Sequence, residues 1–138
     1  MRLYLDANPI IYSIEGVPRF RQASLDWIAR AEADGGVITS RLSRLECRVR
    51  PLRDQNTELL DLFEGFFSRE GLELVEVSDE VIDLATELRA EHDFRAPDAI
   101  HLASALIAKA DVFLPGDRTL RRCPGLTVEV LCGPLDAS

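Results

Sequence analysis

The sequence has few cysteines, a single lysine and no long hydrophobic run. Its three cysteines, Cys47, Cys123 and Cys132, are widely spaced and form no C-x-x-C pair. This argues against a disulfide framework and a structural zinc site, and it predicts reduced thiols. No apolar stretch approaches the roughly 20 residues that span a bilayer, and Asp6 interrupts the N-terminal segment too early for a signal peptide. We therefore expect a cytoplasmic protein that makes no contact with a membrane.

Low-complexity segments and internal repeats are also lacking, which argues against disordered and solenoid proteins. Hydrophobic residues make up 46% of the 138 residues, enough to bury a substantial core. We expect one folded domain over residues 1–138, with the last few residues as a flexible tail.

Basic residues are fewer than acidic ones, 16 against 24, and the net charge of −8 disfavours a nucleic-acid partner. The bases are concentrated, however. The segment "RLSRLECRVRPLR" (41–53) holds five arginines and one acid, and "GDRTLRR" (116–122) adds three more. Fifteen of the sixteen bases are arginine, which binds phosphate oxygens bidentately, although a GC-rich coding bias explains this preference equally well.

Short apolar segments alternate with amphipathic ones along the chain. We expect strands over 2–6, 36–40, 72–77, 111–115 and 127–131. We expect helices from Pro9, over 24–36, 41–49, 57–71 and 78–92, and from Pro97. Pro51 is expected to stop the helix of 41–49, and Ser78 to cap the helix of 78–92. This order predicts an α/β fold, a three-layer sandwich with a mainly parallel twisted central sheet of four to five strands.

A carboxylate opens the segment "RAPDAIHLASALIAK" (95–109), whose apolar residues otherwise recur at helical spacing. Asp98 in the first turn complements the positive end of the helix dipole, which is a purely structural explanation. A parallel sheet, however, places its sites at the carboxyl ends of its strands. Acids follow the first, second and fourth expected strands, and with Asp98 they form a candidate set: Asp6, Glu46, Asp98 and Asp117.

Clustering several carboxylates is costly unless a cation neutralises them, and Mg²⁺ and Mn²⁺ are the hard ions that prefer oxygen ligands. Such a site could activate water and stabilise a phosphoryl transition state. Each acid also has an alternative explanation. Asp6 could cap the following helix, and Glu46 could pair with Arg50 on a helix surface.

Four segments together resemble the PIN domain, in particular the compact VapC-type toxins: "YLDANPIIY", "VITSRLSRLE", "PDAIHLASAL" and "GDRTL". The resemblance covers nearly the full chain. It implies a Mg²⁺- or Mn²⁺-dependent endoribonuclease that cleaves single-stranded or structured RNA and leaves 5′-phosphate and 3′-hydroxyl ends. It also implies the toxin of a toxin-antitoxin pair, with a cognate antitoxin protein and a homodimer. The matching catalytic and metal-binding positions are Asp6, Glu46, Asp98 and Asp117.

Two places depart from the family pattern. Ala7 stands where a Ser or Thr usually follows the first acid. Leu114, Pro115 and Gly116 stand where a hydroxyl and an Asn commonly precede the fourth acid, which puts Asp117 in doubt. Asn8 could offer its side-chain carbonyl to a metal, but we expect it to cap the helix that begins at Pro9.

His101 lies one turn after Asp98 and could act as a general base or a zinc ligand. No Cys or His stands at ligand spacing, so we expect a partly buried residue that holds a neighbour by a hydrogen bond. The aromatic residues at helical spacing are expected in the core or a subunit interface: Trp27, Phe63, Phe66 and Phe67.

The arginines expected to contact RNA are Arg41, Arg44, Arg48 and Arg118. Alternatively, those of 41–53 pair with surface acids such as Asp54 and Glu58, or contact an antitoxin.

Two other functions remain open. A catalytically silent PIN-fold module could bind RNA or protein, although acids at all four positions argue against it. Aspartate-based phosphoryl transfer, as in receiver domains or haloacid-dehalogenase phosphatases, needs a second Asp two residues after the first, or an acid pair with a Lys at a strand end. Here Asn8 stands at the first place, and Lys109 lies inside an expected helix.

Overall fold

The computed structural model describes residues 1–114 and 118–131. Asp117 and the expected C-terminal tail therefore lie outside the described residues. The described strands form one parallel sheet in the order β3-β2-β1-β4. Their bounds are β1 Arg2–Leu5, β2 Gly36–Ser40, β3 Glu73–Val75 and β4 Val112–Leu114. The predicted parallel sheet is confirmed, with β1 and β2 at its centre.

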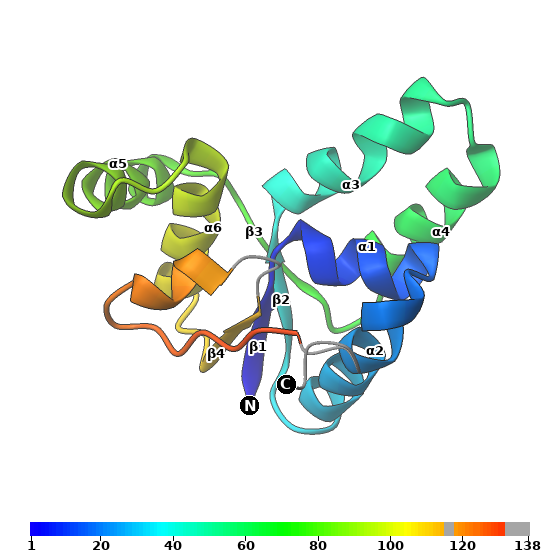
Figure 1. The fold of residues 1–138 in the computed structure, drawn as a ribbon, viewed down its shortest axis with the longest axis horizontal. Coiled ribbons are helices and arrows are strands. Elements are labelled where there is room, and N and C mark those ends of the chain that lie inside the picture. The colour runs from blue at the N-terminus through cyan, green and yellow to red at the C-terminus, as the bar shows by residue number, and fades with distance from the viewer. Residues whose placement is uncertain (115–117, 132–138) are drawn as a thin grey trace.

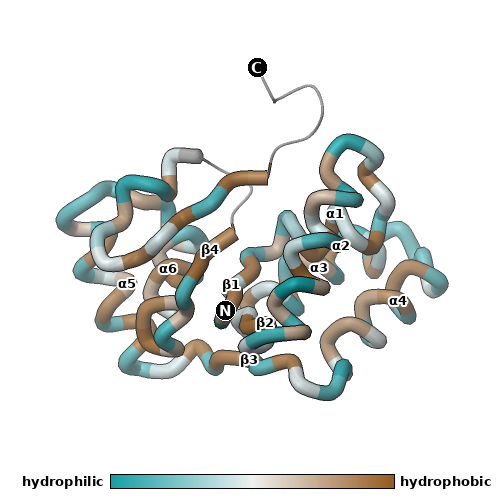
Figure 2. Tube along the Cα trace, turned by 90° about the horizontal axis from the view of Figure 1, so that it is seen from below, coloured by the Kyte–Doolittle hydropathy of each residue, from teal (hydrophilic) through white to brown (hydrophobic). Residues whose placement is uncertain are grey.

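Helices cover both faces of this sheet (Figure 1). On one face lie α1 Ala7–Glu15, α2 Pro18–Ala33, α3 Arg41–Arg53 and α4 Thr57–Phe67. On the other lie α5 Asp79–His92 and α6 Ala96–Ile107, followed after β4 by the short 3₁₀ helix η1 Arg118–Arg122. Figure 2 shows the same separation from below, with the strands between the two groups of helices. The predicted three-layer α/β fold is confirmed.

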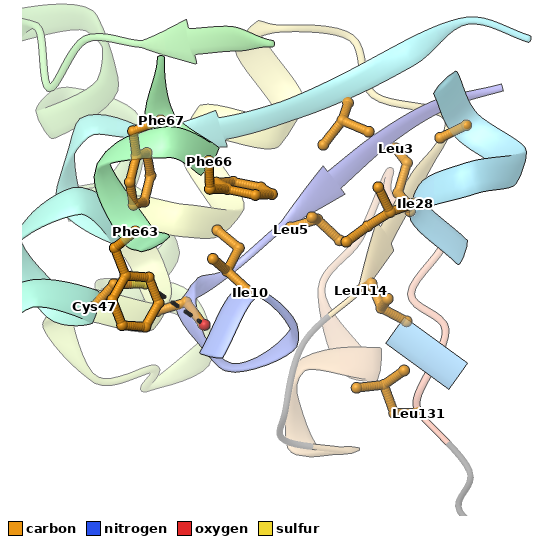
Figure 3. Packing of buried hydrophobic residues seen from close by; sticks show 13 residues of the cluster. Leu3, Leu5, Ile10, Ile28, Cys47, Phe63, Phe66, Phe67, Leu114 and Leu131 are labelled. Carbon is orange, nitrogen blue, oxygen red and sulfur yellow. Dashed lines mark hydrogen bonds between the residues drawn. The ribbon is translucent and has the colours of Figure 1, made fainter. Parts of the chain in front are cut away.

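Each face of the sheet has its own hydrophobic core because successive strand residues point to opposite faces. Leu3 and Leu5 pack in one core with the phenylalanines of α4, whereas Tyr4 packs in the other with α5 and α6. Figure 3 shows the first core, in which Phe63, Phe66 and Phe67 lie beside Ile10 and Cys47. The three phenylalanines are core residues as predicted, and Trp27 packs partly buried against the same core.

Cys47 and Cys123 are buried free thiols, as predicted, and Cys132 lies outside the described residues. Burial raises the pKa of both thiols, which keeps them protonated. None of the helices in the described part of the chain combines the length and hydropathy of a membrane span.

The expected strand over 127–131 does not form in the described residues. Val128 makes only an isolated parallel bridge to Phe113. Two hydrogen bonds hold it there: the Phe113 N–H donates to the Thr127 carbonyl (2.8 Å), and the Glu129 N–H donates to the Phe113 carbonyl (2.9 Å).

Pro51 does not stop α3, which continues to Arg53. A proline inside a helix removes one N–H donor and clashes with the carbonyl four residues earlier. Here it falls in the last turn, where few bonds remain to be made, and its ring is buried. The helix therefore extends through both of the last arginines of its segment, Arg50 and Arg53.

The chain connectivity explains why one edge of the sheet can carry a site. From β1 the chain moves outward through β2 to β3, then crosses to the other side of β1 to form β4. Strand order therefore reverses between β1 and β4. Ligand sites of open parallel sheets form at such a point, outside the carboxyl ends of the strands.

Candidate functional site

A pocket of about 220 Å³ lies at the carboxyl end of β1. It is bounded by the N-termini of α1 and α6 and by the first half of α3. Three of the four predicted acids line it, Asp6, Glu46 and Asp98, although they come from segments far apart in the sequence. The other lining residues are Ala7, Asn8, Arg95, Pro97 and His101. The fourth predicted acid, Asp117, lies outside the described residues.

Asp6 is buried (6% exposed) and caps α1. Its Oδ1 accepts a hydrogen bond from the Asn8 N–H at 3.0 Å, which satisfies one of the unpaired donors of the first turn. The expectation that Asn8 caps a helix from Pro9 is therefore wrong. The helix starts two residues earlier because a proline in the first turn needs no N–H partner. Asn8 is exposed and free to line the pocket.

Glu46 is held by His101, which is buried beneath it (2% exposed). The Nε2 of His101 lies 2.6 Å from the Glu46 Oε1, and its Nδ1 lies 2.7 Å from the Tyr4 hydroxyl. A carboxylate only accepts hydrogen bonds, so Nε2 carries the proton in this pair and Tyr4 donates to Nδ1. The prediction that His101 holds a neighbour by a hydrogen bond is confirmed.

Tyr4 is suited to this donor role because it is fully buried in the second core. Burial raises the pKa of its hydroxyl well above its usual value, which keeps the proton on the oxygen. The result is a buried chain of hydrogen bonds from Tyr4 on β1, through His101 on α6, to Glu46 on α3. This chain fixes α3 against α6 across the pocket.

Asp98 lies in the first turn of α6, as predicted, and its side chain is partly buried (16% exposed). Arg95 donates from Nε to the Asp98 Oδ2 at 3.1 Å, although the arginine side chain itself is 78% exposed. An exposed partner makes this pair weak, about 0–1 kcal/mol. Asp98 is therefore neutralised by a group that can move away.

In the described part of the chain, no three His, Cys, Asp or Glu side chains are grouped closely enough, as arranged, to hold a metal ion. Each pocket carboxylate contacts a protein group instead: a backbone N–H for Asp6, His101 for Glu46 and Arg95 for Asp98. The donor chemistry nevertheless fits Mg²⁺ or Mn²⁺, because the acids supply only oxygen ligands. In these hydrogen bonds, Asp6 accepts through its Oδ1 atom and Asp98 accepts through its Oδ2 atom.

The arginines expected to bind RNA lie mostly on the surface of α3. Arg41 pairs with Glu76 (2.8 Å), and Arg44 pairs with Glu64 (2.9 Å). Arg48 donates from Nε to the Arg44 carbonyl at 3.1 Å. The acids paired with α3 thus differ from the expected Asp54 and Glu58. Arg118 opens η1, and its side chain is outside the described part.

Sequence reasoning missed two residues of the site, Arg95 and Tyr4. The position of Arg95, three residues before Asp98, is the i,i+3 spacing of a helical ion pair and could have indicated their contact. Tyr4 carried a weaker signal, a hydroxyl in the middle of a buried apolar strand, which requires a polar partner.

The PIN domain family model matches residues 3–126 of this chain. No curated protein sequence matches the chain. Among solved structures, the chain is similar to VapBC2 from Rickettsia felis bound to a DNA fragment from their promoter. The TM-score is 0.74 at 19% identity, over 94% of this chain and 98% of that chain.

Two further structures have the same fold. DNA-bound VapBC from Salmonella typhimurium has a TM-score of 0.69 at 20% identity, over 96% of this chain and 99% of that chain. Mycobacterium tuberculosis VapC20, a Sarcin-Ricin loop cleaving toxin, has a TM-score of 0.69 at 14% identity, over 86% and 92%. With the family match over most of its length and this shared fold, the chain belongs to the PIN domain family.

Proposed function

We propose that this chain is a Mg²⁺- or Mn²⁺-dependent endoribonuclease whose active site is the carboxylate pocket. One observation carries the proposal: three carboxylates, one directly after β1 and the others on α3 and α6, line a single pocket at the carboxyl edge of the sheet. Like charges brought together in this way repel one another and favour a divalent cation between them. The proposed metal-binding and catalytic residues are Asp6, Glu46, Asp98 and Asp117.

A bound divalent ion would lower the pKa of a water molecule and stabilise charge on the phosphoryl group. The residues of the chain prepare this chemistry. The α1 N-terminus holds Asp6 in place, and His101 fixes the orientation of Glu46. Arg95 neutralises Asp98 and is exposed enough to release it.

The proposed role is the toxin of a toxin-antitoxin pair, acting on single-stranded or structured RNA. Support comes from the fold shared with VapBC assemblies and with a Sarcin-Ricin loop cleaving toxin. A cognate antitoxin and a homodimer are part of this proposal. A stripe of exposed apolar residues on α3 supports a protein interface there: Leu45, Val49 and Leu52. A catalytically silent module would not need the pocket carboxylates.

The proposal is tested by Asp98→Asn, which keeps the shape of the side chain but removes its charge. We expect cleavage of a single-stranded RNA in Mn²⁺ to fall by about a hundredfold or more. Stability should change little, because the ion pair with Arg95 is weak. Cleavage products are followed on gels, and circular dichroism checks the fold.

The matched control is Asp83→Asn, the same change at an exposed position on α5. It should cleave RNA like the unaltered chain. Equal cleavage by the Asp98 variant and the control would overturn the assignment of the active site.

A further inference from the structure

A second pocket, of about 520 Å³, adjoins the carboxylate pocket. Its lining residues come from the α5–α6 connection, the start of α6 and η1. These segments lie on the α6 side of the sheet (Figure 1). Arg95 and Asp98 line both pockets, so the two lie side by side along the start of α6. The other lining residues are Asp93, Phe94, Thr119, Arg121 and Arg122.

Arg122 is held in place within this second pocket. Its guanidinium carbon lies 4.4 Å from the centroid of the Phe94 ring, a cation–π contact with a buried aromatic residue. Its Nε donates to the Thr119 carbonyl (3.3 Å), and its Nη2 donates to the Asp93 carbonyl (3.5 Å). These contacts reduce the conformational entropy that the side chain would lose on binding a ligand. They also leave other guanidinium N–H groups available.

The Phe94 loop that supports Arg122 is itself fixed. Arg89 on α5 donates from Nε to the Phe94 carbonyl at 2.9 Å. Asp93 ends α5 in the left-handed conformation (φ 56°), which reverses the chain into α6. The loop side of the pocket is thus held by a hydrogen bond from α5 and by the cap of that helix.

Arg121 is exposed and makes no ion pair with any residue that the structure describes. The pocket therefore carries three guanidinium groups, of Arg95, Arg121 and Arg122, against the carboxylates of Asp93 and Asp98. On α3, by contrast, Arg41 and Arg44 are already paired with glutamates. In a chain of net charge −8, this local excess of positive charge favours an anionic ligand.

We propose that the second pocket is a phosphate subsite that binds a non-scissile phosphodiester of the RNA strand. Arg121 and Arg122 are its main contacts, and Arg95 joins it to the carboxylate pocket. The assignment rests on the proposed function, because a scissile phosphate at the carboxylates would place a neighbouring phosphate along the start of α6. Guanidinium groups bind phosphate oxygens through paired, charge-assisted hydrogen bonds.

An acidic protein segment is the competing ligand, since carboxylates also bind arginine. The position of this pocket next to the carboxylate pocket favours RNA, because one extended strand could contact both.

The test measures binding of a short fluorescein-labelled single-stranded RNA in EDTA, where the proposed metal-dependent cleavage cannot occur. We expect Arg121→Ala to weaken binding about two- to fivefold and to reduce the slope of log K against log salt by about one unit. Arg121→Lys keeps the charge and should retain most of this slope. Arg121 is exposed and makes no ion pair with the described residues, so its removal should leave the fold intact.

The matched control is Arg30→Ala on α2, which makes the same charge change at an exposed arginine far from both pockets. The proposal is overturned if the Arg121 and Arg30 variants bind equally well, or if the unaltered chain does not bind the RNA. Loss of affinity for a poly-glutamate peptide alone would overturn it in favour of an acidic protein segment.

Failure of the phosphate-subsite proposal can be told apart from failure of the proposed ribonuclease function. A chain that cleaves RNA through Asp98 but binds it independently of Arg121 lacks the phosphate subsite and keeps the function. A chain that binds through Arg121 but does not cleave keeps the subsite and lacks the function.

Discussion

Glu46 differs from the other pocket carboxylates because a buried side chain holds it. His101 spans from Tyr4 to Glu46 with hydrogen bonds of 2.7 and 2.6 Å. Removing it would leave the Tyr4 hydroxyl, deep in the core, without this acceptor. His101 is thus a positioning residue for Glu46, and it also stabilises the packing of α6 on β1.

We predict that His101→Ala lowers the free energy of unfolding by about 1–3 kcal/mol, because a buried side chain and its two hydrogen bonds are lost. Urea denaturation followed by circular dichroism measures it. The only other histidine, His92, is a matched control: its side chain is partly exposed, and His92→Ala should change stability by less than about 0.5 kcal/mol. Similar losses for both variants would contradict the role given to His101.

A second residue-scale prediction concerns Cys47, whose pKa is raised chiefly by burial and further by the charges of Glu46 and Asp6. In the unfolded chain the thiol ionises near its ordinary value of 9.0. The folded state therefore binds the proton more tightly, and stability falls as pH rises above that value. The stability of the unaltered chain relative to Cys47→Ala should decrease between about pH 8 and pH 10. Urea titrations at both pH values, in reducing buffer, measure it, and a constant difference would refute the prediction.

At the scale of elements, hydrophobic periodicity was enough to predict the helices and the first four strands. It could not predict their ends. The prolines predicted one helix end and one helix start wrongly: α3 continues past Pro51, and α1 begins before Pro9. Pro51 is tolerated because it lies in the last turn of α3, where its ring is buried. The α1 helix begins before Pro9 because Asp6 caps it. The pattern of 127–131 is that of a strand, but pairing depends on contacts with distant segments, and this segment makes only an isolated bridge to β4.

For the site, the sequence predicted which acids meet but not which side chains they contact. The positions of Asp6, Glu46 and Asp98 after strands or at a helix start predicted that they would meet, and the pocket brings them together. Side-chain partners were harder to predict because they depend on rotamers and on contacts between distant segments. The Glu64 partner of Arg44, for example, lies on another helix, 20 positions away in the chain.

The α3 helix supplies both Glu46 and several arginines, which suggests a test of its role in RNA binding. We predict that Arg44→Ala with Arg48→Ala weakens binding of RNA regardless of sequence. The salt slope should flatten by about one unit for each lost phosphate contact. Exposed ion pairs are weak, so pairing with Glu64 leaves Arg44 able to exchange partners. Fluorescence anisotropy over a salt series measures both quantities. An unchanged affinity and slope would show that these arginines serve protein contacts instead.

At the scale of the whole molecule, the strand order creates the site. The strands are parallel, so the carboxyl ends of β1 and β4 lie at the same edge of the sheet, and the strand order reverses between these two neighbours. Helices from opposite faces, α3 and α6, then converge there and bring Glu46 and Asp98 to Asp6. No single segment contains the site, which explains why its residues are spread over most of the sequence.

The central claim is that this pocket uses a divalent metal ion to cleave RNA. Its most direct test is cleavage of a single-stranded RNA by the purified chain after metal removal. We predict no cleavage in excess EDTA and recovery on adding Mn²⁺ or Mg²⁺. Ca²⁺ should restore cleavage poorly, because its longer and looser coordination misplaces the attacking water. Full cleavage in EDTA, at the rate seen in Mn²⁺, would contradict the metal-dependent mechanism.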